Sequence, residues 1–200
     1  VATGLGIAGL YAWGMLRGRR DAYHRIGLTI GLGLAGIVIP LQIISGDLSA
    51  RWVADNQPVK LAALEGLFHT QAGAPLTIGG IPDPATETTR YGIEIPNGLS
   101  LLAFHDPHAV VQGLETVPPE DRPPVVIVHL AFQVMVGIGF ATLGLAIWYW
   151  LTAWRARRRG VLFEPGPWLL RAIVVATPAG FIAIESGWIV TEVGRQPWII

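Results

Sequence analysis

Hydrophobic residues form long uninterrupted runs in this chain and rarely alternate with polar ones. A helix needs about 20 mostly apolar residues to cross the roughly 30 Å hydrocarbon layer of a membrane. Three runs reach that length and a shorter one begins the chain: 26–45, 125–153, 168–190 and 1–16. The pattern predicts an all-α integral membrane protein, a bundle of about four transmembrane helices of which the first is truncated.

A long polar segment, 46–124, separates the first two runs from the last two. It holds ten of the 15 prolines and ten of the 14 carboxylates. Proline interrupts helices and central strands, so we expect this segment to lie outside the membrane and to be mostly irregular. The predicted divisions are therefore 1–45, with two helices, 46–124, a long extracytoplasmic loop, and 125–200, with two further helices and a closing turn.

Arginines in the two short connections predict the orientation of the helices. Cytoplasmic connections of membrane proteins carry an excess of Lys and Arg. The eight arginines concerned are Arg17, Arg19, Arg20 and Arg25 in the first connection, and Arg155, Arg157, Arg158 and Arg159 in the second. Both connections should face the cytoplasm, and the long loop and the end of the chain should face outward.

Composition agrees with a membrane protein and narrows the function. The chain is 52% hydrophobic and only 14% charged, with a mean hydropathy of +0.49 and no net charge. These values are far from those of a soluble domain, and no basic run is long enough to indicate nucleic-acid binding. Cysteine is absent, which excludes disulfides and thiolate metal sites. The first residues lack Met and the features of a signal peptide, so we expect a piece of a longer protein.

Two carboxylates near the end of the chain are candidates for chemistry. An acidic residue inside a spanning helix costs about 2.5 to 3.5 kcal/mol on insertion scales, so it usually faces protein, a cavity or a cofactor. Glu185 is such a residue. Glu192 follows two helical turns later on about the same face, with Trp188 between them, and an interfacial, solvated position is an equal alternative for it. Trp198, beyond the last helix, suits the membrane interface.

Met135 is one of only two methionines, and by itself it suggests a side chain that fills a gap in the core. His129 precedes it by six residues, about 240° around a helix, so the two cannot bind one metal from one face. A thioether ligand would need a histidine from another helix.

Lys60 and Glu65 lie five residues apart in a stretch of good helix formers. This spacing does not make a helical ion pair. The two are either solvated surface charges or groups that address a polar ligand at the membrane surface. His105 and His108 lack a nearby carboxylate or thiolate cluster, which favours ordinary loop histidines over a metal pair.

Four strings in this order resemble subunit I of the cytochrome bd-type quinol oxidases, in the branch with a short quinol loop. They are GDLSARWVADNQPVKLAALEG, GIPDPATETTRYGIEIPNGLSLL, FQVMVGIGF and ESGWIVTEVGRQPW. The resemblance covers essentially the whole chain. It implies a bacterial respiratory oxidase of the cytoplasmic membrane that takes electrons from quinol, reduces dioxygen to water and generates proton motive force without pumping.

The resemblance also implies cofactors and partners. The cofactors are two haems b and a haem d, or a third haem b in place of haem d. The partners are subunit II, membrane quinol, dioxygen and the lipid bilayer, with a small single-span subunit as a further candidate and no nucleic acid. By matching position, Lys60 and Glu65 bind quinol in the loop 46–124, Met135 is an axial ligand of the low-spin haem b, and Glu185 is a ligand of a high-spin haem.

Trp188 and Arg195 are further cofactor-binding candidates, with Arg195 placed to neutralise a haem propionate. The chain departs from many relatives at Gln133, where they carry Arg, and from some relatives at Phe181, where they carry Trp. The family's N-terminal helices are missing, and with them the histidine partner of Met135. This chain alone should therefore not be a working enzyme.

Two other interpretations of the apolar runs remain open. An ion transporter or channel would line its path with Glu185 and Glu192. A non-catalytic membrane anchor or assembly subunit would not need the intramembrane carboxylate at all.

Overall fold

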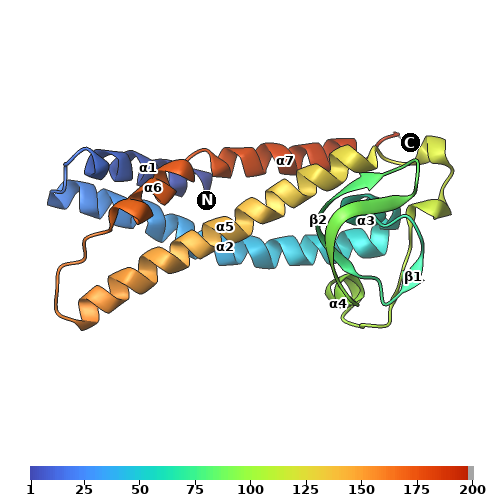
Figure 1. The fold of residues 1–200 in the computed structure, drawn as a ribbon, viewed down its shortest axis with the longest axis horizontal. Helices are drawn as coiled ribbons and strands as arrows, with labels where there is room; N and C mark the ends of the chain where they lie inside the picture. The colour runs from blue at the N-terminus through green and yellow to red at the C-terminus, as the bar shows by residue number, and fades with distance from the viewer. Residues whose placement is uncertain (198–200) are drawn as a thin grey trace. The chain divides into compact units, whose positions relative to one another are not determined.

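The computed structural model describes residues 1–197 and is mostly helical (Figure 1). The chain folds into two compact units. The helical unit comprises 1–43 and 136–184, and the loop unit comprises 44–135 and the chain from 185 onward. The predicted Trp198 at the membrane interface lies outside the described residues.

Within residues 1–197, three helical segments are long and apolar enough to cross a membrane. They contain α2 (Ala22–Asn56), α5 (Val125–Arg158) and the pair α6 (Pro167–Val175) and α7 (Ala179–Val193). The shorter apolar helix α1 (Ala2–Leu16) precedes them. Three of the expected spanning segments are therefore present, and the first apolar run forms a helix of only 15 residues.

Two of the predicted helix boundaries are wrong. Helix α2 does not stop at Ser45 but continues to Asn56. In this additional part of the helix, Asp47 and Arg51 form an ion pair one turn apart. The last run is not one helix, because α6 ends at Val175 and α7 begins only at Ala179. Pro178 lies in the break, where its ring and its missing N–H prevent a continuous helix.

The glycines of α2 let two helices of the helical unit approach closely. A β-carbon on Gly31 would stand 2.6 Å from the Ala8 nitrogen of α1, and one on Gly4 would stand 2.8 Å from the Gly31 oxygen. Only glycine tolerates such an approach between helix backbones. Gly31 therefore packs α2 directly against α1.

One carboxylate joins the two Arg-rich connections of the helical unit. Glu164 lies 3.5 Å from Arg20 Nη1 through one carboxylate oxygen and 3.3 Å from Arg25 Nη1 through the other. The two connections are thus neighbours, as their common assignment to one side of the membrane requires. That this side is the cytoplasmic one remains a prediction.

The long polar segment is not mostly irregular, so that expectation is wrong. Its regular elements are α3 (Pro58–Glu65), β1 (Gln71–Ala72), β2 (Leu76–Asp83), β3 (Thr88–Ile95), α4 (Gly98–Phe104), β4 (Val110–Val111) and the short 3-10 turns η1 (Leu114–Thr116) and η2 (Pro119–Asp121). The strands β2 and β3 form an antiparallel hairpin and β1 pairs with β4. The prolines lie mostly at element boundaries, and β3 contains four β-branched residues among its eight, as strands prefer.

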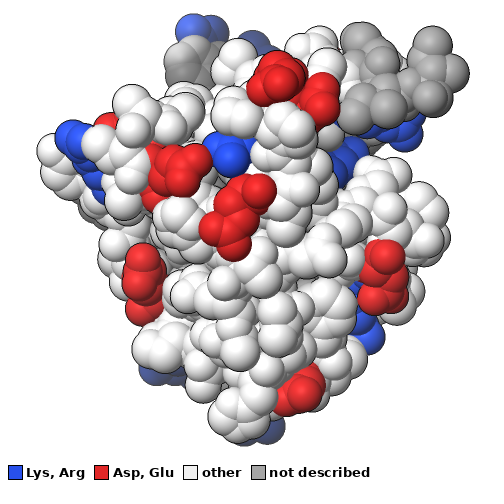
Figure 2. Space-filling view, turned by 90° about the vertical axis from the view of Figure 1, so that its right-hand side faces the viewer, with Lys and Arg blue, Asp and Glu red and all other residues white. Residues whose placement is uncertain are grey.

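Helix α3 is the centre of the loop unit. Its residues 61–65 and the next three, up to Phe68, are all buried. The helix ends at Gly66, whose φ of +65° is a left-handed conformation that suits glycine. A β-carbon there would also stand 2.7 Å from Thr89 Oγ1 of β3. Figure 2 shows acidic side chains spread among mostly uncharged residues.

Candidate functional site

Helix α3 carries both loop residues that the resemblance assigns to quinol. Pro58 begins the helix, where a missing N–H costs nothing. Five residues correspond to about 140° around a helix and about 7.5 Å along it, so Lys60 and Glu65 leave α3 on different sides. The structure places them on one short helix but does not bring their charged groups together as a pair.

Glu65 is a buried carboxyl group without a partner. The residue is only 6% exposed, and its Oε2 has no hydrogen-bond partner among the described residues. Burial raises the pKa of the carboxyl to about 8, so it is mostly protonated at neutral pH. An unpaired buried polar atom costs about 1 to 3 kcal/mol, and such an atom at a helix end marks a place where a polar ligand can bind.

The side chain of Lys60, on α3, lies near the charged residues Glu192 and Arg195 at the end of α7. A β-carbon on Gly194 would stand 3.2 Å from Lys60 Cε, so the aliphatic stem of the lysine lies against bare backbone. Burial lowers the pKa of the ammonium group, the positive charge of Arg195 lowers it further, and the negative charge of Glu192 acts in the opposite direction. Glu192 is thus part of the surroundings of Lys60.

The side chain of Met135 lies against α7 at Gly187. Met135 lies on α5 and is half-buried. A β-carbon on Gly187 would stand 3.1 Å from Met135 Sδ, so the thioether is directed at α7, two residues after Glu185. The structure therefore brings the predicted low-spin ligand close to the helix that carries the predicted high-spin ligand.

Glu185 is exposed on α7, and so is Trp188 at 66%. The carboxylate makes no ion pair within residues 1–197, although it belongs to a segment apolar enough to span a membrane. An uncompensated carboxylate there is costly. This surface fits an apolar cofactor whose iron the carboxylate could bind.

The donor set also fits haem better than a free metal ion. No group of three metal-binding side chains occurs among the described residues. A haem iron needs only axial protein ligands, and the thioether of Met135 and the carboxylate of Glu185 can each supply one. Arg195 is exposed and close enough to Lys60 to affect its charge.

The two loop histidines do not meet. His105 ends α4, and Arg51 Nη1 donates to its Nε2 at 2.6 Å. His108 is exposed, with its main-chain N–H bonded to Asp106.

Two residues on α5 have a role that sequence reasoning missed. His129 is fully buried and contacts main-chain oxygens of Leu64 and Gly79. Gln133 binds the main chain of β2. The only sequence signal is their spacing of four residues, which places both on one face of a helix.

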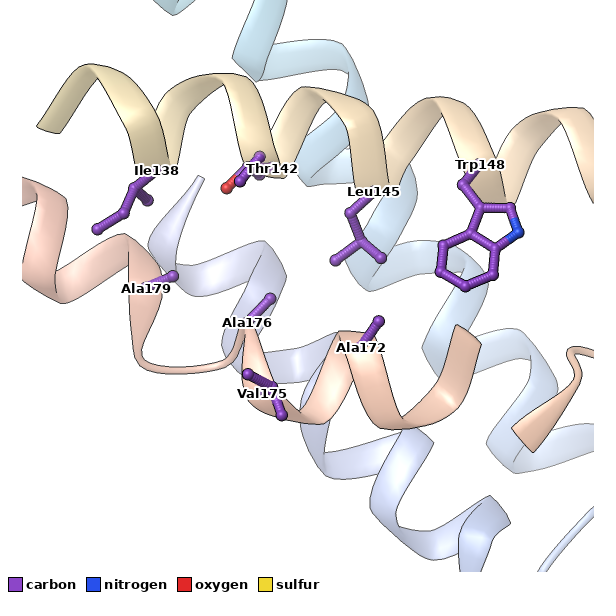
Figure 3. A pocket seen from close by; sticks show the side chains of 9 residues that line it. Ile138, Thr142, Leu145, Trp148, Ala172, Val175, Ala176 and Ala179 are labelled. Atoms are coloured by element: carbon purple, nitrogen blue, oxygen red, sulfur yellow. The ribbon is translucent and has the colours of Figure 1, made fainter. Parts of the chain in front are cut away.

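The helical unit contains an apolar groove with a volume of about 430 Å³ (Figure 3). Its lining residues come from α5, α6, the break after α6 and the start of α7: Ile138, Ala141, Thr142, Leu145, Trp148, Ala172, Val175, Ala176 and Ala179. No predicted site residue lines it, so its surface offers apolar contact and no catalytic chemistry.

Comparison with known proteins found relatives that match this chain over nearly its whole length. Residues 1–200 match the family described as cytochrome bd terminal oxidase subunit I. A Bacillus subtilis protein that is named as a candidate cytochrome bd menaquinol oxidase subunit I is 40% identical to this chain. The match covers 97% of this chain and 44% of the length of that protein. The Escherichia coli cytochrome bd-II ubiquinol oxidase subunit 1 is 29% identical, and the match covers 97% of this chain and 50% of that protein.

A solved structure is also similar. The bd oxidase from Geobacillus thermodenitrificans matches with a TM-score of 0.84 and 39% identity, over 99% of this chain and 44% of that chain. This chain thus spans half or less of the length of these relatives. It belongs to the cytochrome bd terminal oxidase subunit I family.

Proposed function

We propose that this chain is the part of a bd-type oxidase subunit I that binds quinol at its outer face and supplies two axial haem ligands. The observation that carries the proposal is Glu65, a buried carboxyl group with an unpaired oxygen in the loop unit. Family membership sets aside the ion-transporter alternative. The names of the relatives include both menaquinol and ubiquinol oxidases, which supports a quinol as the substrate class.

The quinol ring carries two hydroxyl groups on opposite sides, and α3 offers one polar residue for each. Lys60 donates a hydrogen bond to one oxygen, and its stem is held against Gly194. Glu65 takes the proton from the other hydroxyl when its carboxyl is ionised. A pKa of about 8 lies near the working pH, where general acid–base catalysis is most effective.

Oxidation of one quinol yields a quinone, two electrons and two protons. Met135 and Glu185 would each hold the iron of a haem, and haem would supply the electron-transfer and oxygen-reducing chemistry. A Met/His pair is typical of an electron-transfer haem with a raised potential. Glu185 would place its negative charge next to ferric iron, which offsets the cost of the carboxylate in an apolar segment.

The sides of the membrane on which quinol oxidation releases protons and dioxygen reduction consumes them would account for the proton motive force. If the loop unit faces outward, as the arginine distribution predicts, quinol releases its protons outside. The protons for water come from the cytoplasm, and four are consumed for each dioxygen reduced by four electrons to two waters. Charge is then separated across the membrane without a proton pump.

The test uses the complete oxidase expressed from the full reading frame. Its reduced-minus-oxidised spectrum should contain b-type bands, with a d-type band or additional b-type signal. Lys60→Ala and Glu65→Gln should lower quinol oxidation while leaving electron delivery from an artificial donor intact. A complex without haem bands would contradict the oxidase proposal, and an equal loss with both donors would contradict the quinol role of α3.

A further inference from the structure

His129 connects two separate parts of the loop unit. Its side chain is fully buried, with Nδ1 2.8 Å from the Leu64 oxygen and Nε2 3.0 Å from the Gly79 oxygen. A carbonyl oxygen only accepts hydrogen bonds, so a ring nitrogen that binds either oxygen does so as the donor.

Gln133 binds the same strand one helical turn later. Its Oε1 accepts from the Gly79 N–H at 3.0 Å, and its Nε2 donates to the Thr77 oxygen at 2.9 Å. The main chain of Gly79 is therefore bound on both sides, by His129 at its oxygen and by Gln133 at its nitrogen. We call these two side chains the α5 clamp.

The α5 clamp acts on the residue before Glu65. Leu64, whose oxygen faces His129, is followed directly by the buried carboxyl group. At Gly66, on the other side, Thr89 Oγ1 donates to the main-chain oxygen at 2.9 Å. The backbone is thus held on both sides of Glu65, while Glu65 Oε2 is left without a partner among the described residues.

We propose that His129 and Gln133 are positioning residues for quinol oxidation, which fix the main chain around Glu65 and along β2. The inference rests on the proposed quinol role of Glu65. It also gives Gln133 a function of its own. An arginine at this position could donate to the Thr77 oxygen but could not accept from the Gly79 N–H, because a guanidinium has no acceptor.

The experiment compares variants of the complete oxidase complex. In Gln133→Met, which removes both hydrogen bonds of that side chain, and in His129→Asn, we expect the KM for quinol to rise about tenfold, equivalent to about 1.4 kcal/mol. Turnover with an artificial donor and the midpoint potential of the low-spin haem b should stay at wild-type values. Amide hydrogen exchange in segment 76–83 should become faster.

Two further variants make the result specific. His108→Ala changes an exposed histidine of the same unit and should leave KM and exchange unchanged. Gln133→Arg can still donate to the Thr77 oxygen but can no longer accept from the Gly79 N–H. Hydrogen exchange at the Gly79 amide should therefore become faster in this variant, which tests the clamp even if His129→Asn fails to assemble.

The outcomes separate this inference from the proposed function. A raised KM in Glu65→Gln with a wild-type KM in Gln133→Met would overturn the clamp and keep the quinol site. A wild-type KM in Glu65→Gln with a raised KM in Gln133→Met would overturn the role of Glu65, and with it the positioning of Glu65 by the clamp, and would leave only the action of the clamp on β2. A shifted haem b potential in Gln133→Met without faster exchange would show that Gln133 acts on the haem, which also overturns the inference.

Discussion

The stem of Lys60 on α3 lies against Gly194 at the end of α7, where an added β-carbon would stand 3.2 Å from Lys60 Cε. The contact joins the proposed quinol helix to the helix that carries Glu185. It also brings Lys60 under the influence of Glu192 and Arg195. A change at a residue without a side chain should therefore alter the position of the ammonium group.

We expect Gly194→Ala to weaken quinol binding. The new methyl group would press on Lys60 Cε and collide with the Val190 oxygen, so the end of α7 must shift. We expect the KM for quinol to rise about 3- to 10-fold, equivalent to about 0.7 to 1.4 kcal/mol, with unchanged haem spectra. Gly144→Ala is the control, because nothing lies within 4 Å of its added β-carbon. A normal KM in Gly194→Ala would show that the position of Lys60 is not critical.

The assignment of Met135 as a haem ligand gives a spectroscopic prediction. Met135→Leu should remove the low-spin haem b band and leave any d-type band in place. Gly187→Ala should have a graded effect, because its β-carbon would stand 3.1 Å from Met135 Sδ and displace the thioether slightly. Since methionine ligation raises the potential of a haem, we expect a lower midpoint potential in Gly187→Ala, measured by redox titration. An unchanged band in Met135→Leu would show that another residue is the ligand.

The ionisation of Glu65 should appear in the pH dependence of quinol oxidation. Burial raises the pKa of its carboxyl to about 8, and only the ionised form accepts a proton. In wild-type oxidase kcat/KM for quinol should rise with pH up to about 8 and then level off. In Glu65→Gln this rise should disappear and the remaining rate should be flat. A rise that persists in the variant would assign it to another group, including the substrate itself.

The same shift predicts a pH dependence of stability. The folded chain keeps the Glu65 proton up to about pH 8, whereas the carboxyl of the unfolded chain loses it near the ordinary pKa of 4.5. Wild-type stability should therefore fall as the pH rises from about 4.5 to about 8, by at most about 1.4 kcal/mol per pH unit. Glu65→Gln should lose this slope and unfold at a higher temperature than wild type at pH 8. If wild type and Glu65→Gln differ in melting temperature by the same amount at pH 5 and at pH 8, Glu65 is not desolvated in the complex.

The sequence predicts the helices well because a span-length apolar run has few alternatives. It fails at the loop segment for a physical reason. Prolines counted over 46–124 indicate irregular structure, but they fall mainly at the borders of short elements, and the alternation in TTRYGIEI is that of a strand. The break at Pro178 was available from the sequence, since proline interrupts helices.

The chemical state of the site residues could not be predicted in the same way. Lys60 and Glu65 look alike in sequence, as charges on a short helix, yet one is half-buried beside Gly194 and the other is 6% exposed. Burial depends on which distant segments pack against α3. His129 and Gln133 bind main-chain atoms, which every residue has, so no pattern of side chains marks their partners.

The close approach of α1 and α2 predicts that Gly31 is sensitive to substitution. Gly31→Val should be strongly destabilising, because its β-carbon would stand 2.6 Å from the Ala8 nitrogen and 2.9 Å from the Gly4 oxygen. Neither backbone atom can move without separating the helices, and overpacking of this kind costs about 1 to 3 kcal/mol. Gly33→Ala on the same helix is the matched control, since only the Trp150 ring lies near, at 3.8 Å. Melting temperatures of the detergent-solubilised complex should fall in Gly31→Val and stay near wild type in Gly33→Ala. Equal melting temperatures would mean that α1 and α2 are not packed through Gly31 in the assembled oxidase.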